Sequence, residues 1–113
     1  MFKEIGQLAS LFKQLPKIKE SMEGLQQKVG QITAEGDAGG GMVKAKVNGR
    51  FEVLECSLTD EAMKLNDREM LEDLIRAAVN QAVNKARVKV AEETAKMAGD
   101  LGLPPGMNIP GLG

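Results

Sequence analysis

The sequence contains no histidine, tryptophan or tyrosine, and its single cysteine is Cys56. Without histidine it lacks the side chain that most often transfers protons near neutral pH, and Cys56 has no imidazole to activate it as a nucleophile. The same absences remove the nitrogen and sulfur ligands of a zinc site, and the acidic residues do not have the spacing of a calcium loop. The sequence therefore predicts a protein that is not an enzyme and that uses no cofactor, metal or small-molecule substrate.

A lone cysteine cannot form an internal disulfide, and the first residues lack the basic segment and apolar run of a secretory signal. The longest apolar stretches are interrupted by lysine or glutamate every few positions, so none reaches the length of a membrane span. We expect a cytoplasmic protein with no membrane role.

Phenylalanine is the only aromatic residue type, at Phe2, Phe12 and Phe51. We expect Phe51 to point from a strand into the core, and Cys56 to be a small buried hydrophobic residue. Stacking on single-stranded bases is then not the expected mode of binding.

At 113 residues the chain predicts one domain over residues 1–98, followed by a Gly- and Pro-rich tail over residues 99–113. So small a domain buries a limited share of its surface, which favours an oligomer.

The 15 basic and 16 acidic residues give a net charge of −1, which weighs against a simple nucleic-acid binder. Three windows nevertheless contain no acidic residue and hold ten of the basic ones: residues 5–19, 38–51 and 74–91. The acidic residues gather between Asp60 and Asp73, so we expect a charge-segregated surface. An ordinary mixed-charge surface is the alternative.

Apolar residues spaced alternately three and four apart run from Leu8 to Val29, which is the heptad pattern of a long packing helix. Pro16 should kink or break this helix near Leu15, and Gly30 is the expected end.

The period then changes to the alternation of a strand over Val43–Val47, and Asn48 with Gly49 predicts a type I′ hairpin turn into a strand over Phe51–Leu58. The apolar residues of that second strand change parity, which indicates either a bulge or burial on both faces, and we favour burial on both faces. Residues 31–37 predict a weaker third strand, joined to the hairpin through the glycines at 39–41.

Thr59 can begin a short helical turn, and Asn66 with Glu69 predicts the capping box of a second long helix from Asp67 to about Ala98. About 30 residues of helix span about 45 Å, more than a compact domain of this size, and its alanines would let another backbone approach closely. The prediction is an α+β protomer of one long helix, a three-stranded antiparallel sheet and a second long helix. A twofold-related copy is expected to cover its apolar faces.

The segment Gly39–Gly49 resembles the glycine-rich hairpin of the YbaB/EbfC family. The resemblance continues through residues 70–82 and into the tail at Leu103–Met107. It implies a tweezer-like homodimer that binds double-stranded DNA in the bacterial nucleoid.

The residue patterns and the family resemblance both fit a dimer whose long helices present basic residues to DNA phosphates, largely without recognising the base sequence. The candidate DNA-binding residues are Lys13, Lys17, Lys19, Arg87, Lys89 and Lys96. The alternative for each residue is a solvated side chain that covers apolar neighbours. The alternative for the whole chain is a protein-binding module, a holdase or adaptor of the prefoldin type.

Overall fold

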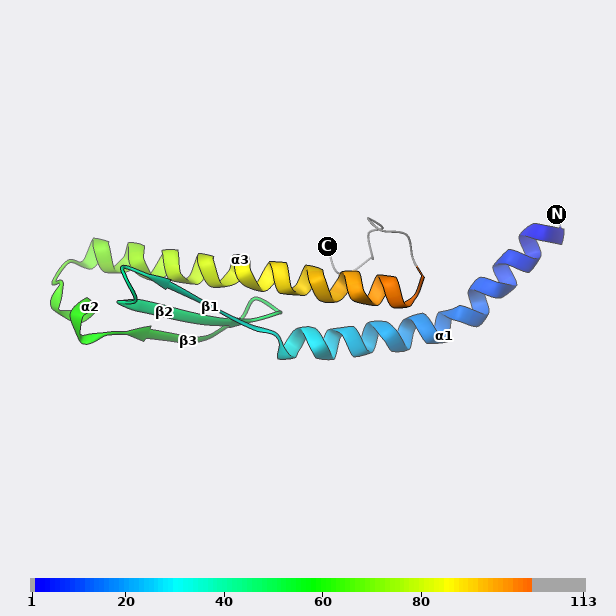
Figure 1. Cartoon of the computed structure of the whole chain (residues 1–113), viewed down its shortest axis with the longest axis horizontal. Coiled ribbons are helices and arrows are strands. Elements are labelled where there is room, and N and C mark those ends of the chain that lie inside the picture. Colours follow the sequence, from blue (N-terminus) through cyan, green and yellow to red (C-terminus); the bar gives the residue numbers. More distant parts are fainter. Residues whose placement is uncertain (1, 103–113) are drawn as a thin grey trace.

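The computed structural model describes the backbone of residues 2–102 and the side chains of Ala9 and of residues 12–102. The elements are α1 (Phe2–Gln31), β1 (Thr33–Ala38), β2 (Val43–Asn48), β3 (Val53–Leu58), α2 (Asp60–Lys64) and α3 (Arg68–Asp100). Their order confirms the predicted α-β-β-β-α plan, including the short helix that follows Thr59. The molecule measures 74 × 20 × 17 Å because α1 continues far beyond the sheet (Figure 1).

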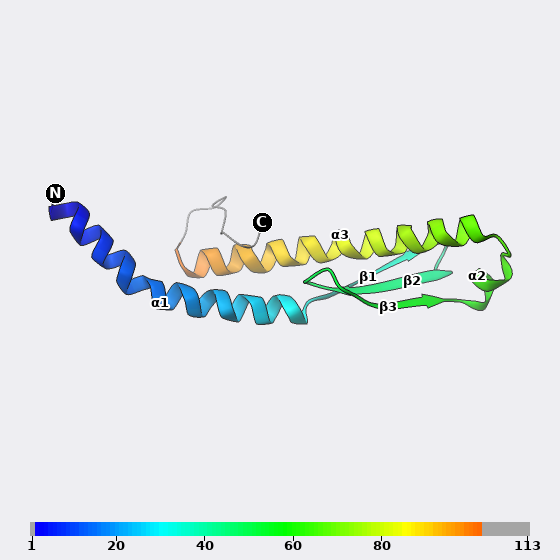
Figure 2. The same ribbon diagram turned by 180° about the vertical axis from the view of Figure 1, so that it is seen from behind.

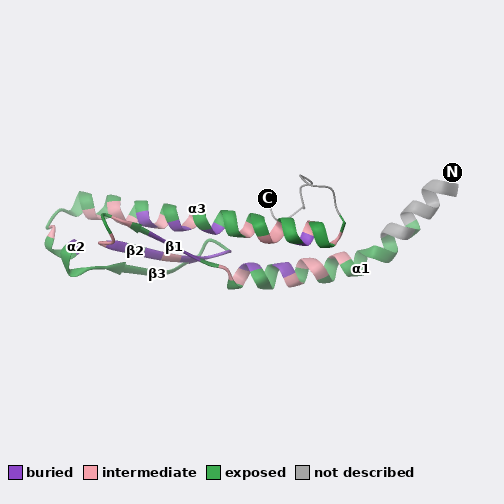
Figure 3. Cartoon of the chain, in the orientation of Figure 1, coloured by how far each residue is buried: buried purple, intermediate pink, exposed green. Residues whose placement is uncertain are grey.

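The strands form one antiparallel sheet in the order β1-β2-β3, and α3 lies along one of its faces (Figures 1 and 2). On β2 the predicted alternation is present, because Val43, Ala45 and Val47 are buried while Lys44 is exposed. Every residue of β3 is exposed (Figure 3). The core therefore lies between α3 and the first two strands.

Close contact between α3 and the sheet depends on small residues. Ala78, Ala82 and Ala86 recur every four residues on α3 and are fully buried. Gly36 on β1 faces the same row, and a Cβ atom there would collide with the carbonyl oxygen of Ala78 and the amide nitrogen of Ala82. The expected close backbone approach at the alanines is thus confirmed.

A second cluster joins the two long helices. Leu25 and Val29 of α1 are buried against Met97 of α3, as the heptad pattern predicts for this half of the helix. Pro16 lies inside α1, and the ribbon bends near it but stays helical, so the proline kinks the helix without breaking it (Figure 1). The helix ends at Gln31, one residue after the predicted stop.

The hairpin between β2 and β3 is confirmed, but the predicted type I′ turn is wrong. Positive φ occurs at Phe51 (64°) and not at Asn48 or Gly49. Asn48 accepts hydrogen bonds through Oδ1 from the backbone N–H groups of Arg50 (2.9 Å) and Glu52 (3.0 Å), which closes a longer turn. Gly49 is instead needed because a Cβ atom there would strike the carbonyl oxygen of Val29 on α1.

The expected burial of β3 on both faces is also wrong, whereas the bulge exists as a register shift opposite Lys46 and Val47. Phe51 is 44% exposed and Cys56 is exposed, so neither is a core residue. A helix about 10 Å across covers two strands spaced about 4.8 Å apart, and the third strand is left uncovered.

The start of α3 differs from the predicted capping box. The N-cap is Asp67, whose Oδ1 accepts a hydrogen bond from the N–H of Met70 at 3.1 Å, while Asn66 has a φ of 48° in the preceding turn. The helix extends to Asp100, beyond the predicted end at Ala98. Of the predicted tail, residues 103–113 lie outside the described residues.

Candidate nucleic-acid interface

All six predicted DNA-binding residues are exposed. Lys13, Lys17 and Lys19 lie on α1, and Arg87, Lys89 and Lys96 lie on α3. Because the C-terminal half of α3 packs along α1, the structure brings the two groups onto one pair of neighbouring helices (Figures 1 and 2).

The three candidate lysines of α1 lie on the part of the helix that we call the arm, residues 2–20. The arm precedes every α1 residue of the α1–α3 cluster and extends past the end of α3 (Figures 1 and 2). Lys13 and Lys17 are four residues apart and project from the same side of the helix, whereas Lys19 is rotated about 200° from Lys17. None of the three forms an ion pair with the residues that the structure describes. Their ammonium groups are available to an anionic ligand.

The three candidates on α3 each have a partner within the chain. Lys89 donates a hydrogen bond from Nζ to the carbonyl oxygen of Thr33 at 2.6 Å, at the start of β1. The guanidinium carbon of Arg87 lies 5.7 Å from the centroid of the Phe51 ring, a cation–π contact. Lys89 and Arg87 therefore also hold the hairpin and β1 against α3, so that a phosphate at either position would compete with an internal contact.

Lys96 lies 3.6 Å from Glu93, an exposed pair that contributes little to stability. A groove of about 270 Å³ between α1 and α3 is lined by Lys96, Glu93 and Asp100, and also by Lys28. Sequence reasoning missed Lys28, which lies in the last turn of α1, where a basic residue also complements the helix dipole. Two acids in this groove balance its two lysines, so the groove is a weaker anion site than the arm.

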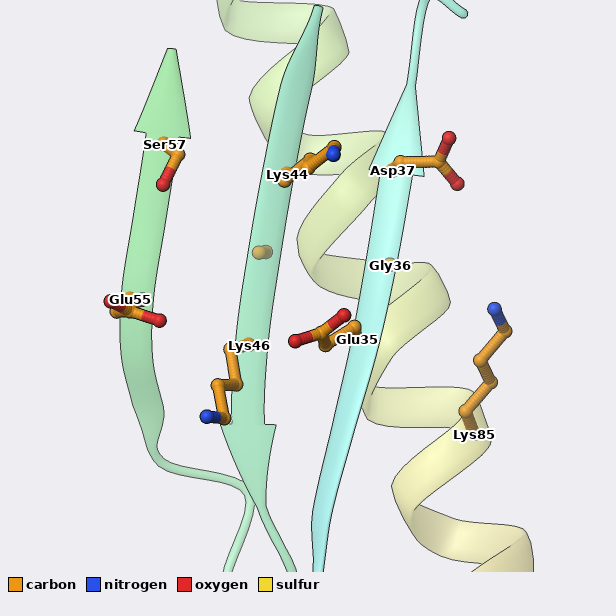
Figure 4. A pocket seen from close by; sticks show the side chains of 9 residues that line it. Glu35, Gly36, Asp37, Lys44, Lys46, Glu55, Ser57 and Lys85 are labelled. Atoms are coloured by element: carbon orange, nitrogen blue, oxygen red, sulfur yellow. The ribbon is translucent and has the colours of Figure 1, made fainter. Parts of the chain in front are cut away.

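The sheet face opposite α3 is a shallow polar trough of about 480 Å³, and its side chains are drawn in Figure 4. In the strand register, Lys46 lies between Glu35 on β1 and Glu55 on β3. The trough combines three acidic and three basic residues: Glu35, Asp37, Glu55, Lys44, Lys46 and Lys85.

The expected charge segregation is therefore wrong for the window at residues 38–51. Lys44 pairs across the strands with Asp37, and Lys46 pairs with Glu35 and Glu55. All three acidic residues lie outside the window, so the sequence window alone does not show them. Net attraction for a polyanion on this face is small, which leaves the long helices as the candidate interface.

Other kinds of site find no support in the described part of the chain. In the part of the chain whose side chains are described, Ala9 and residues 12–102, there is no group of three or more His, Cys, Asp or Glu side chains able to hold a metal ion. Within the same part, no helix is both long and apolar enough to cross a membrane.

Comparison with known proteins gives consistent matches. The model of the YbaB/EbfC DNA-binding family matches residues 4–101. A nucleoid-associated protein of Pelotomaculum thermopropionicum is 39% identical over 99 residues, which cover 88% of this chain and 94% of that protein. A nucleoid-associated protein of Caldanaerobacter subterraneus subsp. tengcongensis is 43% identical over 103 residues, which cover 91% of this chain and 87% of that protein.

The fold also matches a solved structure. The crystal structure of an uncharacterized protein from Helicobacter pylori aligns with a TM-score of 0.59 over 89% of this chain and 96% of that chain. At 23% identity this likeness shows the fold alone.

Proposed function

The chain belongs to the YbaB/EbfC DNA-binding family, and on that premise we propose that it binds double-stranded DNA as a homodimer, through phosphate contacts and largely without sequence preference. The observation that carries the proposal is the arm of α1, which extends past the sheet and past the end of α3 with Lys13, Lys17 and Lys19 exposed. The family and the residues lacking from the sequence agree that the protein is not an enzyme.

Phosphate contact fits the side chains that are available. Lysine presents a flexible point charge that neutralises a phosphate without requiring a particular base, so such contacts position a protein without specifying sequence. Base stacking is disfavoured because Phe51 is engaged by Arg87 and Phe12 is the one other aromatic side chain that the structure describes. We therefore assign contacts first to the arm and then to Arg87, Lys89 and Lys96.

The homodimer is supported by the uncovered edge of the sheet. Val53, Leu54 and Leu58 of β3 are exposed, and Glu55 is the strand's single charged residue. Natural proteins seldom leave an apolar edge strand open, because it pairs with other chains. Val79 and Val83 of α3 are also only partly buried against the core, so they leave further apolar surface open. A second copy that packs against this surface would complete the core and place two arms on one particle.

Two arms change the expected strength of binding. Lys13, Lys17 and Lys19 on each arm would give six phosphate contacts per dimer, for which the slope of log K against log salt is about −5. Affinity should then fall about 10³-fold between 50 and 200 mM salt, and further if α3 contributes. Because relatives at about 40% identity are named nucleoid-associated proteins, we place the proposed activity in the bacterial cytoplasm, at the nucleoid.

The test is a salt titration of binding to a random-sequence DNA duplex, with the mass of the protein followed by light scattering. We expect a dimer whose affinity falls steeply with salt and does not depend on base sequence. A dimer that binds no duplex even at low salt would overturn the DNA proposal. It would favour the protein-binding alternative, in which the exposed apolar residues of the arm would contact an unfolded or partner protein.

A further inference from the structure

The heptad seam of α1 is covered along only part of its length. In the half that packs on α3, Leu25 is 3% and Val29 is 8% exposed. On the arm, Phe12 is 67% and Leu15 is 49% exposed, although Leu15 belongs to the same heptad pattern. Nothing among the described residues covers this part of the seam.

The seam becomes uncovered where α3 ends. Leu101 follows the last helical residue and packs against the cluster of Met22, Leu25 and Met97. Gly102 then takes a φ of 72°, the left-handed conformation that turns a chain out of a helix. The next eleven residues therefore start beside α1, at the beginning of the exposed seam.

The composition of residues 103–113 suits an apolar surface. This segment has no charged residue, and it carries four large apolar side chains at Leu103, Met107, Ile109 and Leu112. Prolines at positions 104, 105 and 110 exclude a regular helix and favour an extended chain. An extended uncharged chain can lie along a helix and place several of these apolar side chains on it.

We propose that residues 103–113 run back along the arm of their own chain and cover Leu15 of its apolar seam together with the exposed Phe12 beside it. Eleven extended residues span up to about 36 Å, whereas the ten residues of helix between Met22 and Phe12 span about 15 Å. Lys13 and Lys17 lie on the side of the helix opposite Leu15, so they would remain exposed when the segment is bound. The proposal does not depend on DNA binding.

The arm of a second copy is a less favourable cover for this seam than residues 103–113, because the arm is positively charged. Residues 2–20 contain four lysines and two glutamates, a net charge of +2, so two arms placed side by side repel each other. The uncharged C-terminal segment carries no such penalty. It also stays close to the seam in every molecule, because it is attached beside it.

Paramagnetic NMR on the full-length chain without DNA tests the proposal. Cys56 is replaced by serine, and a nitroxide is attached to Cys in an Asn108→Cys variant. We expect the amide signals of Phe12 and Leu15 to lose intensity and to recover when the nitroxide is reduced. A nitroxide at Lys64→Cys on α2, at the opposite end of the molecule, is the control and should leave those signals unchanged (Figure 1).

Two further measurements keep the proposal falsifiable. Leu15→Glu should remove the intensity loss at Phe12, whereas Val88→Glu, at an exposed apolar position on α3, should not. In a mixture of isotope-labelled chains and separate nitroxide-carrying chains, the arm signals should keep their intensity. Loss in that mixture would mean that a second copy supplies the segment. No loss in the singly labelled sample would mean that the segment does not dock on the arm. Either result overturns the proposal, and neither bears on DNA binding.

Discussion

Replacing Gly36 by alanine tests the contact that holds α3 on the sheet. Gly36 is buried on β1, and the Cβ atom of an alanine there would overlap two backbone atoms of α3, well inside van der Waals contact. These atoms belong to a regular helix and cannot rotate away as the end of a side chain could. The helix would have to move away from β1, and the packing of Ala78 and Ala82 against the sheet would loosen.

The cost can be worked out from this geometry. Overpacking a well-packed core costs about 1–3 kcal/mol, and rigid backbone at the point of collision places Gly36→Ala at the upper end. Loss of the glycine's extra freedom in the unfolded chain returns about 0.5–1 kcal/mol. The net loss of stability is about 2 kcal/mol, which lowers the melting temperature of a domain of this size by about 8–16 °C.

The assay is thermal unfolding followed by circular dichroism, with all variants at one protein concentration because the melting temperature of the proposed homodimer would depend on it. Gly24→Ala is the matched control, since Gly24 lies inside α1 and a Cβ atom there meets no atom within 4 Å. Alanine is better than glycine in a helix by about 1 kcal/mol, so this variant should melt at a higher temperature. If Gly36→Ala were neutral or stabilising as well, the close contact between β1 and α3 would be refuted.

Three other substitutions test separate parts of the molecule. Leu58→Glu places a charge on the uncovered face of β3 and should shift the dimer towards monomer in sedimentation equilibrium, whereas Ser57→Glu on the polar face should not; equal masses would contradict the assigned interface. Asn48→Ala removes the acceptor of two backbone N–H groups in the hairpin and should cost about 1–3 kcal/mol in urea unfolding, so an unchanged midpoint would mean that the turn closes without it. In the proposed dimer, Lys17→Gln would remove two phosphate contacts and should reduce the salt slope by about 2, while Lys64→Gln on α2 should leave the slope unchanged; identical slopes would exclude Lys17 from the interface.

Local patterns predicted the elements of this fold, and contacts between distant segments decided what the patterns missed. The heptad spacing of Leu25 and Val29 and the alternation of Val43 to Val47 repeat within a few residues, so sequence alone located α1 and β2. The role of Gly49 could not be found in this way. Its partner is Val29 on α1, twenty residues away, and the two meet only when the hairpin folds against the end of the helix.

The candidate site shows the same division. The lysines of the arm were predictable because their exposure follows from a helix that extends beyond its neighbours. The internal contacts of Lys89 and Arg87 were not, because their partners Thr33 and Phe51 lie 56 and 36 residues earlier in the sequence. In the polar trough, Lys46 belongs to a sequence window without acidic residues, but the fold places it between Glu35 on β1 and Glu55 on β3, whose negative charges balance its positive charge.

The errors on β3 themselves carry information about assembly. An apolar pattern predicts that a residue will be buried but does not say by which chain. Sequence reasoning expected Phe51 and Cys56 to be buried, and the single chain leaves both exposed, together with Val53, Leu54 and Leu58. All five residues lie within the segment Phe51–Leu58, in or just before the edge strand β3, and every residue of β3 is exposed (Figure 3). A strand that faces solvent in the assembled protein would carry polar residues on its exposed face. In β3, however, Cys56 and Leu58 lie on the same sheet face as the buried Ala45 and Val43. The pattern is that of a core strand whose cover is missing from the single chain. This is the surface on which a second copy is expected to pack.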